Sequence, residues 1–265
     1  MQVTKYFPDF KSKAFTLSFD DAVVQDRRII ELFKKYQLKA TFNINSGLFD
    51  VVWVLKYDNK TQDHIRISAK EAVTLYKGFE VAGHTVTHPS LTYLDFDAIK
   101  SEVINDKMTL EELFRTDVRG LAYPGGAFDK RTADILRELG IWYARTIEAT
   151  NSFKLPADFL QWHPTCHYSN AFKFADKFIN SKKKDLQLFY VWGHSYELDR
   201  KKDDWESFEC FCAAISNKAD IWYAENIEIC DYINALNVLE FEGEKPVNNS
   251  GIQLYLEIEN KKVIV

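Results

Sequence analysis

The chain has 265 residues, a formal net charge of −5 at neutral pH and a hydrophobic fraction of 46%. A chain of this length and composition can bury a substantial core, either as one large α/β domain or as two small ones. The negative charge and the lack of a basic patch exclude an electrostatically driven nucleic-acid surface, so we expect no nucleic-acid partner. No apolar run is long enough to span a bilayer, and we expect no membrane partner either.

The four cysteines, Cys166, Cys210, Cys212 and Cys230, lack the spacing of a zinc site. Cys210 and Cys212 are separated by one residue, which is too close for an easy disulfide, and we interpret all four as reduced thiols. The amino terminus has no charged segment followed by an apolar one, as a signal peptide would have. We therefore expect a cytoplasmic protein, unless a leader has been trimmed away. The sequence leaves the oligomeric state open.

The first strong signal along the chain is an alternating, apolar run over residues 14–19, which is followed directly by Asp20 and Asp21. The run predicts a buried strand. Two adjacent carboxylates at the end of a buried strand are costly, because their charges repel and both lose water. Such a pair needs a cation or a proton. The alternative is that one aspartate merely caps the helix that begins near Val24.

Strand and helix signals then alternate as far as about residue 236. Further strands are predicted at residues 40–45, 79–83, 117–123, 141–147 and 186–192, with a short one near residue 163. Helices are predicted at residues 24–37, 68–76, 95–114, 129–139, 170–180, 203–216 and 226–236. The stretch 46–63 has neither signal, and we expect an irregular excursion over the site there.

This alternation predicts parallel strands joined by crossover helices. We therefore predict an α/β fold, a distorted (β/α) barrel with about seven parallel strands, over residues 1–236. Residues 237–265 are different, because they contain Gly243, Pro246 and Gly251 and then alternate in hydropathy. For them we predict a small C-terminal β extension that packs on the barrel.

Histidines also follow predicted strands. His84 and His88 come after the third strand, and His194 comes after the strand at residues 186–192. The carboxyl ends of parallel barrel strands share one face, so these residues are expected to meet the acidic pair. Two imidazoles four residues apart and one aspartate make a ligand set that suits Zn²⁺, with Fe²⁺ as the rival. Thr85 follows the first histidine, which excludes the zinc-protease motif because that motif requires glutamate there.

Four motifs, taken in order, resemble those of the polysaccharide deacetylases (the NodB homology domain, carbohydrate esterase family 4). They are Ser18-Phe19-Asp20-Asp21, His84-Thr85-Val86-Thr87-His88, Tyr123-Pro124-Gly125-Gly126 and Gly193-His194. The resemblance covers roughly residues 14–236, and the first two motifs are the specific ones. It implies a seven-stranded barrel and a divalent metal, usually zinc.

The resemblance also implies roles for individual residues. Asp21, His84 and His88 match the metal ligands, Asp20 the general base and His194 the general acid. Gly125 stands where the family offers a backbone N–H to the oxyanion. Tyr123, Trp192 and His163 are candidates for the wall of the substrate site, with core packing equally open for Trp192.

Two departures from the family pattern matter. The family's third motif often begins with an arginine that orients the general base, and here that position is Ala122. Arg145 ends the next predicted strand, and we expect it to reach Asp20 instead. The fourth motif, which holds the catalytic histidine, has no clear match, so the partner of His194 stays open.

The sequence therefore predicts a metal-dependent hydrolase that removes acetyl groups from an N- or O-acetylated carbohydrate, with N-acetyl amino sugars favoured. One alternative is a hydrolase of non-sugar linear or cyclic amides, although members of that kind tend to alter the metal ligands that are present here. The other alternative is a carbohydrate-binding protein with little catalysis. The retention of both Asp20 and His194 argues against it, because a pure binding protein needs neither a base nor an acid.

Overall fold

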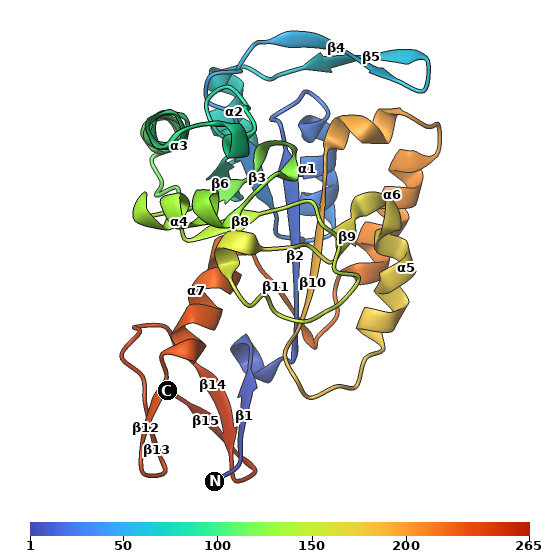
Figure 1. Ribbon diagram of the computed structural model, residues 1–265. Coiled ribbons are helices and arrows are strands. Elements are labelled where there is room, and N and C mark those ends of the chain that lie inside the picture. Colours follow the sequence, from blue (N-terminus) through green and yellow to red (C-terminus); the bar gives the residue numbers. More distant parts are fainter.

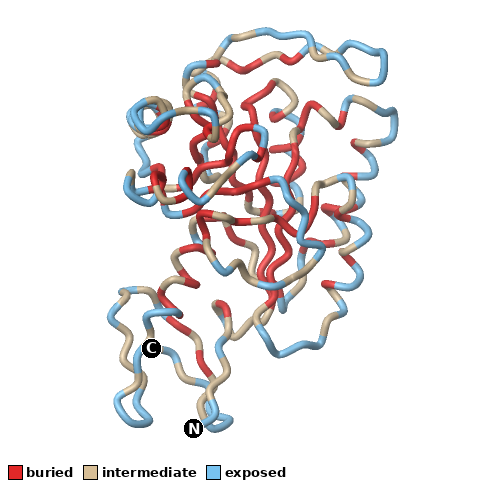
Figure 2. Tube along the Cα trace, in the orientation of Figure 1, coloured by how far each residue is buried: buried red, intermediate tan, exposed pale blue.

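The computed structural model describes the whole chain, residues 1–265 (Figure 1). A curled parallel sheet forms the centre of the molecule, and helices cover its outside. A two-stranded hairpin lies at one end of the sheet, and small antiparallel sheets lie at the opposite end with both chain termini. Buried residues concentrate along the central strands, whereas the residues of the hairpin and of the terminal sheets are mostly exposed or of intermediate burial (Figure 2).

The central sheet has the strand order β8-β7-β6-β3-β2-β10-β9, and β11 pairs with β2 as an eighth strand. All of these pairings are parallel. The strands are β2 (Lys13–Asp20), β3 (Thr41–Ile44), β6 (Glu80–Gly83), β7 (Gly120–Ala122), β8 (Tyr143–Arg145), β9 (Cys166–His167), β10 (Gln187–Gly193) and β11 (Ile221–Tyr223). The strands β2 and β10 are buried along their whole length, which agrees with the nearly continuous apolar sequence of β10, whereas β2 alternates apolar residues with buried polar ones.

The sheet closes through the segment between β8 and β10. Arg145 of β8 forms a parallel bridge with Trp162, and Cys166 of β9 pairs with Val191 of β10 a few residues later. One short segment thus joins the two ends of the sheet. The predicted α/β fold, a distorted barrel of about seven parallel strands, is confirmed.

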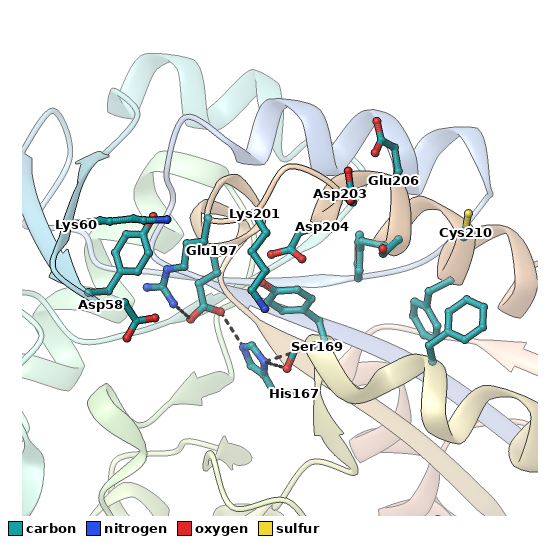
Figure 3. Close-up of a pocket in the computed structure, with 17 residues that line it drawn as sticks. Asp58, Lys60, His167, Ser169, Glu197, Lys201, Asp203, Asp204, Glu206 and Cys210 are labelled. Carbon is teal, nitrogen blue, oxygen red and sulfur yellow. Dashed lines mark hydrogen bonds and ion pairs between the residues drawn. The ribbon is translucent and has the colours of Figure 1, made fainter.

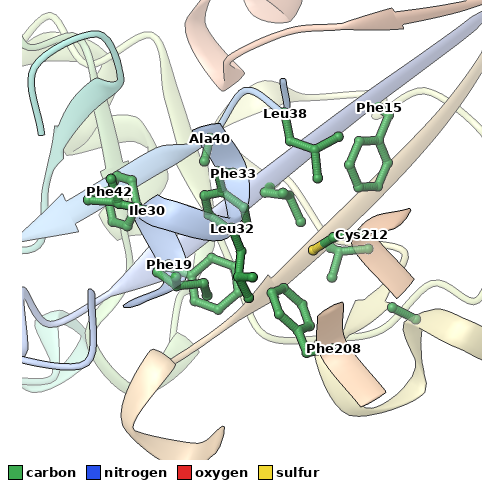
Figure 4. Packing of buried hydrophobic residues seen from close by; sticks show 14 of the residues in the cluster. Phe15, Phe19, Ile30, Leu32, Phe33, Leu38, Ala40, Phe42, Phe208 and Cys212 are labelled. Carbon is green, nitrogen blue, oxygen red and sulfur yellow. The ribbon is translucent and has the colours of Figure 1, made fainter. Parts of the chain in front are cut away.

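Seven helices surround the sheet. They are α1 (Asp26–Lys35), α2 (Ala69–Leu75), α3 (Phe96–Phe114), α4 (Lys130–Glu138), α5 (Tyr168–Ile179), α6 (Asp204–Ile215) and α7 (Asn226–Asn237). Their apolar faces meet the sheet in an aromatic core that includes Phe19 of β2, Phe33 of α1 and Phe208 of α6 (Figure 4). The Phe33 and Phe208 ring centroids lie 5.7 and 5.8 Å from that of Phe19. Such a ring cluster fixes helices α1 and α6 against β2, the strand that carries the acidic pair.

The expectation of an irregular excursion over residues 46–63 is wrong. Most of this stretch is a regular antiparallel hairpin, β4 (Val52–Tyr57) and β5 (Lys60–Ile65), which pairs with no strand of the barrel. Its turn residues, Asp58 and Asn59, have φ values of 43° and 60°, a conformation that Asp and Asn tolerate in a two-residue hairpin turn. The sequence gives no clear strand signal on either side of this turn, because both strands are mostly exposed and lack a clear apolar face.

The C-terminal segment forms two small antiparallel sheets. The strands β14 (Tyr255–Ile258) and β15 (Lys261–Ile264) pair with each other, and β1 (Val3–Tyr6) adds to β14 from the other end of the chain. A second hairpin consists of β12 (Glu240–Glu242) and β13 (Lys245–Val247). The Tyr232 hydroxyl of α7 donates to the Tyr6 carbonyl at 2.6 Å and accepts from the Tyr255 amide, which ties this sheet to the barrel. The division of the chain at residue 236 stays a prediction, and no helix combines the length and hydropathy that a membrane span requires.

Candidate active site

The acidic pair stands at the carboxyl end of β2. The Asp20 side chain is 3% exposed and is held on both oxygens: Asn43 donates to Oδ1 at 2.8 Å and Arg145 donates to Oδ2 at 2.5 Å. Burial alone would raise the pKa of Asp20, but the positive charge of Arg145, with smaller contributions from His84 and His194, brings the pKa below its ordinary value. Asp20 is therefore an ionised carboxylate in a nearly closed environment. Arg145 lies where we expected it.

Asp21 has a different set of neighbours. Its backbone adopts φ 91°, which a non-glycine residue rarely does and which turns its carboxylate toward the end of the barrel. His64 contacts Asp21 Oδ2 at 3.2 Å, and Arg66 forms an ion pair with Oδ1 at 3.0 Å while donating to the Asp21 carbonyl. Burial would raise the pKa of Asp21, but His64 and Arg66 hold it well below its ordinary value.

The two histidines of the second motif face each other across a tight turn. His84 directly follows β6, and its Nδ1 bonds to the Ala122 carbonyl at 2.8 Å, which leaves Nε2 directed at the acidic pair. The Thr85 hydroxyl accepts the His88 amide at 3.1 Å, and this turn brings the two imidazole centroids within 4.6 Å. Both Thr85 and His88 have positive φ values, 67° and 63°. Such backbone strain at non-glycine residues often marks a functional site.

This arrangement fits a divalent metal. One ligand atom from each of Asp21, His84 and His88 lies within 4.8 Å of the others. Asp21 Oδ1 is buried and lies 3.9 Å from His84 Nε2, but it is also ion-paired with Arg66 at 3.0 Å, so a metal ligated by this oxygen would share it with the guanidinium. Burial lowers the pKa of His84 to about 4, which keeps the imidazole neutral, as ligation requires. The Ala122 carbonyl supplies the outer-shell bond that ligating histidines usually make.

His194 directly follows β10 and lies beside Asp20. Its Nε2 is 3.7 Å from Asp20 Oδ2, and its Nδ1 is 3.5 Å from Glu197 Oε2. Burial would lower the pKa of His194, but Glu197 and the acidic pair raise it above the ordinary value. Glu197 lies in a short 3₁₀ turn, η5 (Ser195–Asp199), and also contacts His167 Nε2 at 2.8 Å. Glu197 is therefore the nearest acidic neighbour of His194 Nδ1, which is buried and makes no hydrogen bond.

A cavity of about 270 Å³ connects these groups. It is lined by the acidic pair, by four histidines, by Gly125 and by two of the predicted wall residues, Tyr123 and Trp192. Trp192 packs under the Arg145 guanidinium at 4.6 Å from the ring centroid, so it also supports the residue that holds Asp20. A Cβ atom added at Gly125, which has φ 62°, would meet no atom within 4 Å, so the backbone at this position is open toward the cavity.

The structure does not place His163 in this cavity. Its Nδ1 bonds to the Thr146 hydroxyl at 2.7 Å, and its ring packs against Phe128 at 5.5 Å between centroids. These contacts hold the imidazole over the loop that follows β8. Our prediction of a site-wall role for His163 therefore has no support in the cavity beside Asp20.

Sequence reasoning missed four polar residues that contact the site. His64 lies in β5 and Arg66 directly follows that strand, and nothing in the sequence placed either residue beside Asp21. Glu197 and His167 were likewise not assigned to the site. The one available signal was spacing, because Glu197 follows His194 by three residues and a single helical turn brings such a pair together.

The comparisons with known proteins agree on one family. The family model described as Polysaccharide deacetylase matches residues 8–144, just over half of the chain. No curated protein sequence matches significantly. Among solved structures, a protein from Mycobacterium smegmatis assigned as a polysaccharide deacetylase is 16% identical, with a TM-score of 0.63, and the match covers 92% of this chain and 98% of that one.

Two further structures share the fold. A family 4 carbohydrate esterase from Streptomyces lividans, in complex with acetate, is 12% identical with a TM-score of 0.51, covering 81% of this chain and 93% of that one. A family 4 pseudoenzyme from Bacillus anthracis is 18% identical with a TM-score of 0.52, covering 86% and 68%. This chain spans 55% of the length of a Streptococcus pyogenes deacetylase that also matches. The family match and the barrel together show that the chain belongs to the polysaccharide deacetylase family.

Proposed function

We propose that this protein is a metal-dependent deacetylase that hydrolyses the acetyl group of an acetylated carbohydrate, with N-acetyl amino sugars as the favoured substrates. The observation that carries the proposal is the placement of Asp20. Its carboxylate lies between Arg145 and His194 and beside a three-residue ligand set, within one cavity. A base, an acid and a Lewis-acid site within reach of one bond are what amide or ester hydrolysis needs.

Asp20 is the general base in this proposal. The bonds from Arg145 and Asn43 fix both carboxylate oxygens, so the group cannot rotate away from the attacking water. The same bonds keep the carboxylate ionised in spite of its burial. Asp20 therefore accepts the proton of the water as that water attacks the acetyl carbon.

The divalent metal would be held by Asp21, His84 and His88. Two nitrogen ligands and one oxygen ligand favour Zn²⁺. When bound, such an ion polarises the acetyl carbonyl and lowers the pKa of water. The backbone N–H at Gly125 is proposed to donate to the oxyanion that develops on the carbonyl oxygen. The open backbone at Gly125 supports this role.

His194 is the general acid. Its raised pKa favours the imidazolium form, and Glu197 on Nδ1 directs the other ring nitrogen toward Asp20 and the reacting centre. From there Nε2 donates a proton to the departing amine or alkoxide.

The test is acetate release from a panel of acetylated mono- and oligosaccharides, by metal-stripped protein with and without added Zn²⁺, and by Asp20→Asn. We expect release that depends on the metal and falls by about 100-fold or more in Asp20→Asn, since a general base contributes that much. Metal content is measured for both proteins and is expected to stay at one ion per chain. Unchanged release by Asp20→Asn would reject Asp20 as the base.

A second candidate is a carbohydrate-binding protein without turnover. The position of the Arg66 guanidinium, 3.0 Å from Asp21 Oδ1, favours it, because a cation beside a ligand atom weakens the binding of a second cation. A matched structure of this fold, from Bacillus anthracis, is described as a family 4 pseudoenzyme. Failure to bind one Zn²⁺ per chain, together with retained binding of an acetylated sugar, would decide for this candidate.

A further inference from the structure

A second and larger cavity adjoins the site, and the proposed reaction does not yet use it. It has a volume of about 1010 Å³ and is lined by 17 residues, which come from the hairpin β4–β5, the start of α5, the turn η5 with the loop after it, and α6 (Figure 3). We call it the side groove. One wall depends on the hairpin, an element that pairs with no strand of the barrel.

Glu197 connects the side groove to the catalytic cavity. It lines the groove, and its carboxylate contacts both His167, another groove residue, and His194 of the catalytic cavity. The groove therefore begins next to the proposed general acid, the residue that protonates the leaving amine or alkoxide in the proposed reaction. The leaving group is the sugar itself, so the groove lies where the rest of a sugar chain would continue.

The walls of the groove carry aromatic surface that the fold itself does not cover. Phe172 of α5 lines the groove and is 54% exposed, which is unusual for a phenylalanine that could pack against a neighbour. Tyr57 of the hairpin and Tyr168 of α5 face the same space. Arg200 packs on the Tyr57 ring at 4.8 Å from the centroid, and so presents its polar edge beside an aromatic face. Aromatic faces interleaved with polar groups suit sugar rings, which have apolar C–H faces and hydroxyl edges.

The charges of the groove lining restrict the class of sugar that it can bind. Its lining contains five carboxylates, on Asp58, Glu197, Asp203, Asp204 and Glu206, against three basic side chains, on Lys60, Arg200 and Lys201. Such a surface disfavours acidic sugars and attracts positively charged ones. The product of N-deacetylation is an amine, which is positively charged at neutral pH. The groove is therefore complementary to a sugar chain that has already lost acetyl groups.

We propose that the side groove binds the amino-sugar units next to the reacting sugar in a partly deacetylated oligosaccharide. The proposal rests on the proposed deacetylase function and makes it more specific, because it names an oligomer with free amines as the substrate class. It predicts that affinity rises with chain length and with the number of free amines. Phe172 then serves as a stacking surface and takes no part in the chemistry.

The experiment measures binding by isothermal titration calorimetry with three probes: glucosamine, its pentamer, and a galacturonic acid pentamer. The wild type is compared with Phe172→Ala and with the matched control Phe96→Ala, which removes a phenylalanine of similar exposure, 42%, outside the groove. We expect the glucosamine pentamer to bind at least about 10-fold more tightly than either other probe. We expect Phe172→Ala to weaken pentamer binding by about 5-fold and to leave glucosamine binding unchanged, as loss of one stacked ring would.

Two results would overturn the groove assignment: equal affinity for the two pentamers, or a Phe172→Ala protein that binds the glucosamine pentamer as tightly as Phe96→Ala does. Because these probes carry no acetyl group, the result does not depend on turnover. Retained pentamer binding without acetate release from any sugar would reject the deacetylase function while keeping the groove. Acetate release with no effect of chain length on affinity would reject the groove alone.

Discussion

The single carboxylate of Glu197 joins two histidines that the sequence did not connect. It contacts His194 and His167 and also pairs with Arg200 at 3.0 Å, so its position is fixed from three sides. These contacts hold the pKa of Glu197 below its ordinary range in spite of burial, and the group carries a permanent negative charge. Glu197 does not touch the substrate's reacting atoms. It is a positioning residue that sets the orientation and the protonation of His194.

Glu197→Gln tests this role. We expect kcat to fall by about 100-fold, because a displaced catalytic group loses about that much. Loss of the negative charge also lowers the pKa of His194, so the alkaline limb of the pH dependence of kcat is expected to move to lower pH. Glu112→Gln, an exposed acid on α3 that lines neither cavity, is the matched control. A loss of kcat without any movement of the alkaline limb would leave Glu197 with a purely structural role.

The hairpin β4–β5 is an element that serves the site more than the fold. Its base supplies His64 and Arg66 to Asp21, and its tip supplies Tyr57 to the side groove. Gln62 donates to the Tyr196 carbonyl, which ties the hairpin to the turn that carries Glu197. A two-stranded hairpin is only marginally stable by itself, so its contribution to the stability of the barrel is small.

A variant with a shortened hairpin measures how much the hairpin contributes to the stability of the barrel. Trp53 and His64 are directly paired across the two strands, so a two-residue Asn-Gly turn can join them in place of residues 54–63. This change removes the outer part of the hairpin and keeps Trp53, His64 and Arg66. We expect the free energy of unfolding to fall by less than about 2 kcal/mol. Zinc content is expected to stay unchanged, and KM for an acetylated oligosaccharide to rise. Loss of cooperative unfolding would show instead that the hairpin is part of the folding unit.

At the scale of the whole molecule, one partly buried carboxyl joins three separate elements. Glu80 accepts hydrogen bonds from Thr41 of β3 at 2.6 Å, from Tyr143 of β8 at 2.8 Å and from the Ile227 amide of α7 at 3.0 Å. Burial nevertheless raises the pKa of Glu80 to about 7, since these neutral donors replace only part of the lost hydration. The folded protein therefore keeps a proton on Glu80 that the unfolded chain loses near its ordinary pKa of 4.5.

The stability of the protein should depend on pH through this group. The contribution of protonated Glu80 is fully present below pH 4.5 and is lost as the pH rises to about 7, an effect of about 3 kcal/mol at most. We expect Glu80→Gln to reduce the fall in Tm between pH 5 and pH 8 relative to the wild type. Differential scanning calorimetry of both proteins isolates the contribution of Glu80 to the pH dependence of Tm, because all other titratable groups are the same in both proteins. An equal fall in both proteins would contradict the prediction.

The fold was predictable because its signals are local. Each barrel strand is a short apolar run followed by a helix with one apolar face. Only a few folds with parallel strands are compatible with that alternation. The meeting of Asp20, His84 and His194 followed from the same rule, because each stands directly after a strand and the strand ends share one face. The expected contact between Arg145 and Asp20 belongs to the same class, since Arg145 ends the strand β8.

What the sequence by itself determined is therefore the α/β barrel, the family and the set of residues at the strand ends. Only the tertiary structure decided which side chains surround them: His64 and Arg66 lie on Asp21, Glu197 lies near His194, and His163 bonds to Thr146 and is not among the residues that line the cavity. Strand periodicity and crossover handedness act over neighbouring residues and can be deduced from the order of amino acids. The partners of a buried charge are chosen by packing among elements far apart in the chain, and no local pattern encodes that choice.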